Sequence, residues 1–139
     1  MQLIVWDTSI YIHKLRSGFN LVSNGFEELV LSSVVVAELA TGYTTRSVKS
    51  EEFRKYVEYM YIKNGVITPS FSDWYNSGII IGKIIYKRPD LKNKKALLSN
   101  DCLIALSSKK VNAKVITSNI KDFELLREYI NFQVSYQSC

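Results

Sequence analysis

Three acidic residues stand in sequence surroundings where a carboxylate is costly. Asp7 ends a short apolar run, Glu38 interrupts the apolar stretch VVVAELA, and Asp101 lies in SNDCLIAL. Carboxylates in apolar surroundings are unfavourable when unpaired, and several together repel one another. A hard divalent cation, Mg²⁺ or Mn²⁺, resolves both problems because it prefers oxygen ligands. We interpret these acids as a candidate metal site.

Two further polar residues, Asn119 and Asp122 in TSNIKDF, extend this candidate catalytic set. Each member also has a simpler interpretation when it is taken alone. Asp7 fits a helix cap, Asp101 a first-turn acid, and Asn119 and Asp122 ordinary helix-start residues. Glu38 could pair with a lysine. Only the set as a whole favours a metal site, with Asp7, Glu38, Asp101 and Asp122 as its ligands.

The elements that must position this set follow from the hydropathy pattern, which alternates between short apolar runs and helical periodicity. Strands are expected at 2–6, 29–31, 66–69, 114–117 and 132–136, and helices at 8–15, 34–42, 48–63, 73–86, 97–111 and 121–129. This alternation predicts an α/β fold with a parallel central sheet of four to five strands, flanked by helices on both faces. Ligands of such sheets gather at the carboxyl ends of the strands, where the acids would converge.

Some local features are specific enough to check. Ser32 and Ser33 are expected to cap the helix that bears Glu38, and Ser70 or Ser72 the helix at 73–86. Asp101 is expected to open its helix. The helix at 48–63 should bury Phe53, Val57, Met60 and Tyr61 on one face and end at Gly65.

Composition predicts one soluble globular domain, 1–139, with 47% hydrophobic and 22% charged residues. The N-terminus does not resemble a signal peptide and no apolar run could span a bilayer, so we expect a cytoplasmic protein without a membrane partner. Cys102 and Cys139 do not form a disulfide framework, and no His/Cys cluster has zinc-ligand spacing. A net charge of +5 favours a polyanionic partner.

In these motifs the sequence resembles the PIN (PilT N-terminus) domain family, and within it the toxin components of VapBC-type toxin–antitoxin pairs. The resemblance runs nearly end to end, and four motifs occur in the expected order and spacing. They are the opening strand with Asp7-Thr8-Ser9, the segment 33–39 with Glu38, the segment 100–105 with Asp101, and the segment 117–123 with Asn119 and Asp122. Singly these motifs are weak, but together they are fairly specific.

The resemblance implies a Rossmann-like PIN fold, an acidic cleft that binds Mg²⁺ or Mn²⁺, and cleavage of RNA. Family members often carry a fourth acid where this chain has Asn119, and Asp122 could supply the missing charge. Thr8, Ser9 and Thr117 could orient the ligands, although helix capping fits them equally well. The implied partners are an RNA substrate, a second copy of the chain and a small antitoxin protein.

A basic segment precedes the helix of Asp101 and could hold RNA phosphates, or could simply be a solvated loop. Its candidate residues are Lys87, Arg88, Lys92, Lys94 and Lys95. The apolar segments FRKYVEYMYIK and WYNSGIIIGKIIY are richer in aromatic residues than a lone domain needs, which favours contact with another chain.

Two other functions remain open from the sequence. One is an RNA-binding module of the same fold with a weakened metal site, of which Asn119 would be the first sign. The other is a small-molecule phosphohydrolase with an aspartyl nucleophile, although Ser9 stands where the second aspartate of that motif usually occurs. A dinucleotide site is disfavoured because no GxGxxG follows the first strand.

Overall fold

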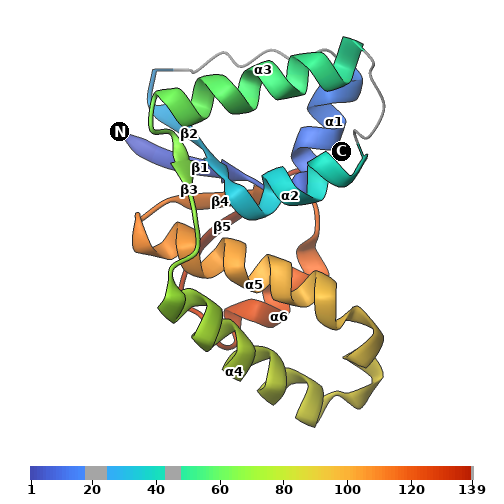
Figure 1. Ribbon diagram of the computed structural model, residues 1–139. Coiled ribbons are helices and arrows are strands. Elements are labelled where there is room, and N and C mark those ends of the chain that lie inside the picture. Colours follow the sequence, from blue (N-terminus) through green and yellow to red (C-terminus); the bar gives the residue numbers. More distant parts are fainter. Residues whose placement is uncertain (18–24, 43–47, 139) are drawn as a thin grey trace.

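The computed structural model describes residues 1–17, 25–42 and 48–138. In this part of the chain, five parallel strands form one sheet in the order β3-β2-β1-β4-β5, with helices on both faces (Figure 1). The strands are β1 (Gln2–Trp6), β2 (Glu27–Ser32), β3 (Val66–Ile67), β4 (Lys114–Thr117) and β5 (Gln133–Tyr136). The helices are α1 (Thr8–Ser17), α2 (Ser33–Gly42), α3 (Val48–Ile62), α4 (Phe71–Lys87), the 3₁₀ helix η1 (Pro89–Lys94), α5 (Lys95–Lys110) and α6 (Ile120–Arg127). The predicted α/β class and parallel sheet are confirmed.

The central strands are apolar because both of their faces are covered. Val5 of β1 is aligned with Val30 of β2 on one side and with Val115 of β4 on the other. All three valines are buried, as expected for a parallel sheet that helices cover on both faces. In Figure 1, α3 and α1 lie above the sheet, and α4, α5 and α6 lie below it. Strand β1 is central in the strand order, so Asp7 follows a strand that both neighbours hold in place.

Serine caps begin two of the helices as expected. The Ser32 hydroxyl accepts the backbone N–H of Val34 at 3.2 Å at the start of α2. Ser70 begins α4 in a capping box, in which its hydroxyl accepts the N–H of Asp73 and the Asp73 carboxylate accepts the N–H of Ser70. Lys110 at the end of α5 pairs with Asp73 at 3.3 Å. This acid therefore fixes the start of α4 against α5 and takes no part in the candidate site.

Three local predictions need correction. Helix α3 buries Phe53, Tyr56 and Met60, whereas Tyr61 is 76% exposed because it is turned by about 100° from Met60 around the helix. The helix ends at Ile62, and Asn64 rather than Gly65 has the positive φ of the turn. The basic segment is not a loop, because η1 leads from Pro89 directly into α5.

Among the described residues, no helix is long and apolar enough to cross a membrane. Cys102 is a free, buried thiol, and Cys139 lies outside the described residues.

Candidate active site

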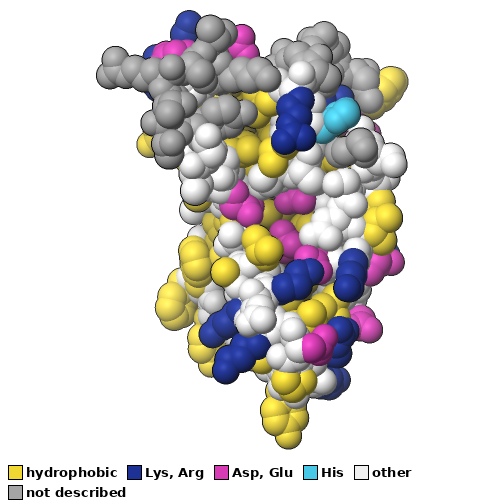
Figure 2. Space-filling view, turned by 90° about the vertical axis from the view of Figure 1, so that its right-hand side faces the viewer, with side chains coloured by type: hydrophobic (Ala, Val, Ile, Leu, Met, Phe, Trp, Pro, Cys, Tyr) yellow, Lys and Arg dark blue, Asp and Glu magenta, His cyan; other side chains and the backbone are white. Residues whose placement is uncertain are grey.

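The four candidate acids come from four separate elements that meet at the carboxyl ends of the central strands. Asp7 follows β1 and precedes α1, and Glu38 lies in the interior of α2. Asp101 lies two turns inside α5, and Asp122 lies in the first turn of α6. Figure 2 shows acidic side chains gathered at the middle of one face of the molecule, with lysine and arginine side chains directly below them. The predicted convergence is thus reproduced in the described structure.

Asp101 was expected to open its helix, and this is wrong. Helix α5 begins at Lys95 because the backbone of η1 continues into it without a break. Asp101 therefore occupies an interior position, and the residue is only 7% exposed. A helix cap would face water, so this acid lacks the simpler explanation that the sequence allowed.

Hydroxyl groups hold Asp7 in place. The residue is 5% exposed, and its Oδ2 accepts hydrogen bonds from Thr117 Oγ1 at 2.8 Å and from Ser9 Oγ at 3.2 Å. The Thr117 hydroxyl also accepts the backbone N–H of Asn119 at 3.0 Å. Thr117 and Ser9 thereby link the end of β1 to the end of β4 and fix the orientation of the Asp7 carboxylate.

Glu38 is fixed in a similar way from the neighbouring helices. Thr8 Oγ1 donates to Glu38 Oε1 at 2.8 Å, and the Asn100 side chain donates a second hydrogen bond. Burial raises the pKa of Glu38, the negative charge of Asp7 raises it further, and the two hydrogen bonds oppose that shift. Asn100 is not among the residues predicted from the sequence, where its position immediately before Asp101 is its only signal.

Asp101 carries the strongest electrostatic strain in the site. Burial raises its pKa to about 8, and the charges of Asp7, Glu38 and Asp122 act in the same direction. The carboxyl group of Asp101 is therefore close enough to those of Asp7, Glu38 and Asp122 for their negative charges to act on it. At neutral pH the ionised cluster is therefore unfavourable unless a cation offsets it.

Asn119 and Asp122 lie at the start of α6, and the Asn119 amide links Asp122 to Asp101. Asn119 is the N-cap of α6, and its Nδ2 donates to Asp122 Oδ2 at 3.1 Å and to Asp101 Oδ2 at 3.4 Å. Asp122 is 6% exposed and accepts hydrogen bonds from Lys94 Nζ at 2.8 and 3.1 Å. Burial acts to raise the pKa of Asp122, but Lys94 and Asn119 outweigh it and the pKa is lowered.

The donor chemistry fits a divalent cation such as Mg²⁺ or Mn²⁺. Across residues 1–17, 25–42 and 48–138, no three His, Cys, Asp or Glu side chains are close enough to form a closed metal-binding group. Mg²⁺ does not require one, because it keeps several waters and is usually held by one or two carboxylates together with substrate phosphates. Asp7, Glu38 and Asp101 are the residues that would hold it.

The residues of the basic segment occupy different environments. Arg88 forms a bidentate ion pair with Asp90, and Lys87 Nζ lies 5.9 Å above the ring centre of Tyr129. Lys92 and Lys95 are exposed, whereas Lys94 reaches into the acidic site. The five residues therefore do not form one uniform phosphate-binding surface.

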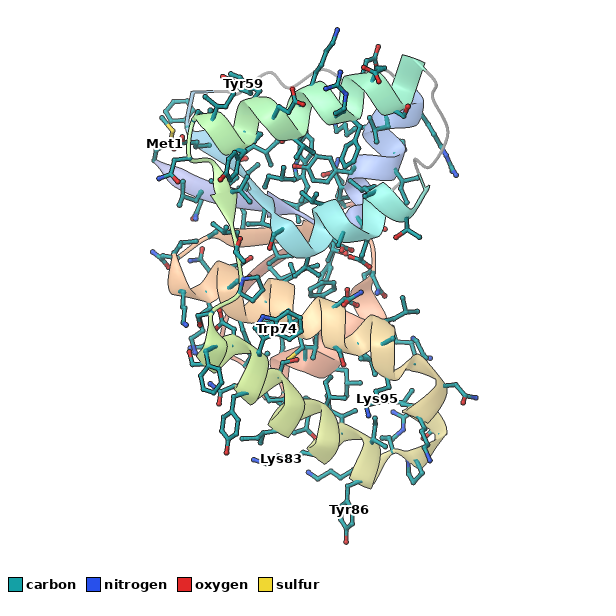
Figure 3. The ribbon with its side chains drawn as sticks, in the orientation of Figure 1. Met1, Tyr59, Trp74, Lys83, Tyr86 and Lys95 are labelled. Carbon is teal, nitrogen blue, oxygen red and sulfur yellow. The ribbon has the colours of Figure 1, made fainter. Side chains whose placement is uncertain are left out.

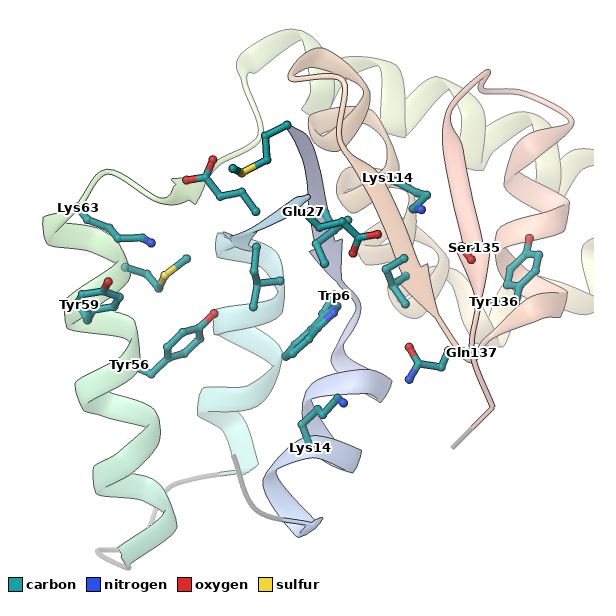
Figure 4. Close-up of a pocket in the computed structure, with 16 residues that line it drawn as sticks. Trp6, Lys14, Glu27, Tyr56, Tyr59, Lys63, Lys114, Ser135, Tyr136 and Gln137 are labelled. Carbon is teal, nitrogen blue, oxygen red and sulfur yellow. The ribbon is translucent and has the colours of Figure 1, made fainter. Parts of the chain in front are cut away.

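A separate pocket of about 770 Å³ lies between α3 and the strands β1, β4 and β5 (Figure 4). Its lining includes Trp6, Lys14, Tyr56 and Lys114, and none of the four site acids belongs to it. The candidate active site is thus distinct from this pocket.

Comparisons with solved structures agree with this fold. VapBC2 from Rickettsia felis, bound to a DNA fragment from its promoter, has a TM-score of 0.64 and 22% identity, covering 99% of this chain and 100% of that one. VapBC-1 from nontypeable Haemophilus influenzae has a TM-score of 0.58 and 22% identity, covering 97% and 98%. DNA-bound VapBC from Salmonella typhimurium has a TM-score of 0.58 and 21% identity, covering 98% of both chains.

A comparison with curated proteins gives no match. The PIN domain family, in contrast, matches residues 4–128, a span that contains Asp7, Glu38, Asp101, Asn119 and Asp122. With a family match over most of its length and a sheet of the corresponding topology, this chain belongs to the PIN domain family.

Proposed function

We propose that the protein is a Mg²⁺- or Mn²⁺-dependent endoribonuclease that acts as the toxin of a VapBC-type toxin–antitoxin pair. PIN domains are generally nucleases that use divalent metal ions. The single observation that carries the proposal is the meeting of Asp7, Glu38, Asp101 and Asp122 in one mostly buried cluster, where burial and the neighbouring negative charges raise the pKa of Asp101.

The chain's own residues would prepare the site for RNA hydrolysis. Thr117 and Ser9 orient the Asp7 carboxylate, and Thr8 and Asn100 orient that of Glu38. A bound divalent cation would supply positive charge against the scissile phosphate and activate the attacking water. Fixed carboxylates suit this task, because their geometry need not change when the cation and the RNA arrive.

The reaction balances as a simple hydrolysis. The oxygen of water forms a new bond to phosphorus, and the bond from phosphorus to the 3′-oxygen breaks. Water gives up one proton and the departing 3′-oxygen takes up one proton. The products carry a 5′-phosphate on one fragment and a 3′-hydroxyl on the other.

Lys92 and Lys95 are the exposed candidates for phosphate contacts outside the acidic cluster. Both lie in or directly after η1, at the approach to the helix that carries Asp101. Their positive charge would attract the RNA backbone and compensate for the repulsion that the acids exert on it. Lys87 and Arg88 would contribute only after leaving Tyr129 and Asp90.

The test is incubation of the purified chain with a mixed RNA pool, with Mn²⁺ or with EDTA. We expect cleavage with Mn²⁺, loss with EDTA, and loss in Asp7→Asn, whereas Glu52→Gln, which changes an exposed acid of α3, retains activity. RNA retention without cleavage would favour the RNA-binding module. Release of inorganic phosphate from small esters would favour the phosphohydrolase.

A second part of the proposal concerns an antitoxin partner. The structurally similar VapBC assemblies from Rickettsia felis and Salmonella typhimurium are described as bound to DNA. We propose that a small partner protein inhibits this chain by placing a basic side chain against the acidic cluster. Co-expression with the product of an adjacent short reading frame, followed by an RNA cleavage assay of the complex, tests this.

We propose that the chain forms a homodimer through the outer face of α4. Apart from Lys83 and Lys87, the exposed side chains of α4 are uncharged. The largest are Phe71 (85% exposed), Trp74, Tyr75 and Tyr86 (88%). Tyr86 points away from the body of the molecule in Figure 3. Buried against a partner, these four would remove about 600 Å² from water, close to the roughly 800 Å² per partner of a standard interface.

Several features favour self-pairing at this face. Gly78 and Gly82 have open space where a side chain would begin, so large rings from a second α4 could pack over them. Because the outer face of α4 presents few charges, two copies would meet there with little of the repulsion expected between chains of net charge +5.

We place this assembly in the cytoplasm, where the free thiol of Cys102 would stay reduced.

A further inference from the structure

Lys94 is the one residue of the basic segment whose ammonium group contacts a candidate site acid in the described structure. Its Nζ lies 2.8 and 3.1 Å from the two carboxylate oxygens of Asp122. The Lys94 side chain is 37% exposed and that of Asp122 is 8% exposed, so the lysine enters from the rim. Lys94 directly precedes α5, and Asp101 lies seven residues later, about two turns into that helix.

The polar contacts divide the site into two halves. In one half, hydroxyl groups of Thr8, Ser9 and Thr117 support the carboxylates of Asp7 and Glu38. In the other half, positive or amide N–H donors surround Asp122, since Lys94 contacts both of its oxygens and Asn119 Nδ2 contacts Oδ2.

This second half is poorly suited to a second divalent ion. Nucleases with two ions hold them about 3.5–4 Å apart with carboxylates shared between them. Here Asn119 is neutral and presents its N–H₂ group to both Asp101 and Asp122. An ion on this side would have to displace the Lys94 ammonium from Asp122 and turn the Asn119 amide.

We propose that Lys94 is a positioning residue whose fixed positive charge takes the place of a second divalent ion, so that each chain binds one ion. The inference rests on the proposed function, because it assumes that Asp7, Glu38 and Asp101 hold that single ion. An ammonium group has three N–H donors, so Lys94 can bind both Asp122 oxygens and direct a third donor toward an RNA phosphate oxygen. This role differs from that of Lys95, which is exposed and follows it in sequence.

The test is the number of Mn²⁺ ions bound per full-length chain, measured by calorimetry and by electron paramagnetic resonance without RNA. We expect one ion for the wild type, and two for Lys94→Met at millimolar Mn²⁺, because Asp122 then lacks its cation. Lys94→Arg keeps the charge and should bind one ion. Lys95→Met is the matched control and should also bind one.

Cleavage kinetics give the second readout. Lys94→Met should lower kcat by about 10²-fold at low Mn²⁺, in the range found when one preorganised electrostatic contact is removed, and millimolar Mn²⁺ should partly restore it. Lys95→Met should change KM alone. If circular dichroism shows Lys94→Met to be unfolded, Lys94→Gln replaces it in both measurements.

The outcomes separate the two proposals. Two ions in the wild type, or one ion in folded Lys94→Met, would overturn the role of Lys94. One ion in the wild type and two in the variant, with no RNA cleavage by either, would support Lys94 and refute the ribonuclease. No ion in the wild type would refute the metal site and the role of Lys94 together.

Discussion

Replacing Asp101 with Asn should stabilise the metal-free protein while it abolishes cleavage. Asp101 is 7% exposed and lies near three other acids, which together with burial raise its pKa to about 8. The same side chain has a pKa of about 3.9 in an unfolded chain. Between these two values the folded state binds more protons than the unfolded state, so the free energy of unfolding falls as the pH rises from about 4 to 8.

The magnitude follows from the same two pKa values. At pH 7 the unfolded chain would ionise Asp101 whereas the folded chain keeps it mostly protonated, and this difference would cost the fold about 4 kcal/mol. Relaxation of the coupled carboxylates reduces this cost, so we expect Asp101→Asn to raise the free energy of unfolding by about 1–3 kcal/mol. That corresponds to an increase in Tm of roughly 3–10 °C.

Thermal denaturation in EDTA at pH 4, 5.5, 7 and 8 measures the effect. The difference in Tm between Asp101→Asn and the wild type should be small at pH 4 and should grow toward pH 8. Asp90→Asn, an exposed control paired with Arg88, should show no such trend. Added Mn²⁺ should stabilise the wild type and leave Asp101→Asn unchanged. A variant that is less stable than the wild type at pH 8 in EDTA would refute the electrostatic reasoning.

Three further substitutions test the surroundings of the site, the core and the assembly. Thr117→Val removes the 2.8 Å hydrogen bond to Asp7 and should weaken Mn²⁺ binding by about 10–100-fold in calorimetry, with an unchanged circular dichroism spectrum. Tyr11→Phe removes the buried 2.9 Å contact with the Tyr56 hydroxyl and should lower the free energy of unfolding by about 1 kcal/mol in urea. Tyr75→Lys places a charge on the exposed face of α4 and should convert a dimer to a monomer in light scattering.

Each of these expectations has a clear contrary result. Unchanged Mn²⁺ affinity in Thr117→Val would mean that the hydroxyl does not orient Asp7. If Tyr11→Phe and the wild type have the same free energy of unfolding, the hydroxyl contact between Tyr11 and Tyr56 does not stabilise the core. A wild-type chain that is monomeric at high concentration would refute self-pairing through α4.

The sequence predicted the sheet well because its strands carry a simple signal. Buried parallel strands are continuous apolar runs, and those at β1 and β4 end at polar residues that mark the functional edge. The serine caps were equally readable, since Ser32 and Ser70 stand directly before helical periodicity. Local chemistry decides features of this kind.

The errors arose where tertiary packing decides between equivalent patterns. Helix α3 has tyrosines on several sides, and packing against the core, including the contact of Tyr56 with Tyr11, buries Tyr56 and not Tyr61. The start of α5 was placed too late because η1 gives no hydropathy signal of its own. Asp101 therefore lies in the interior of the helix and not at its start.

The site was predictable in its acids and not in their partners. Asp7, Glu38, Asp101 and Asp122 were recognisable from apolar surroundings and motif spacing. The contact between Lys94 and Asp122 joins residues 28 positions apart, so no local pattern could indicate it. Among five nearby basic residues, only the described structure distinguishes the one that enters the site.

The most direct test of the shared acidic site is a crystal structure of the full chain grown with Mn²⁺, with the ion located by its anomalous scattering. We predict one strong peak per chain at about 2.0–2.3 Å from carboxylate oxygens of Asp7 and Asp101, the range for Mg²⁺-like oxygen coordination. Glu38 should lie at the same ion directly or through one water, and Lys94 should remain on Asp122. A peak away from these residues, or none at saturating Mn²⁺, would contradict the proposed metal site.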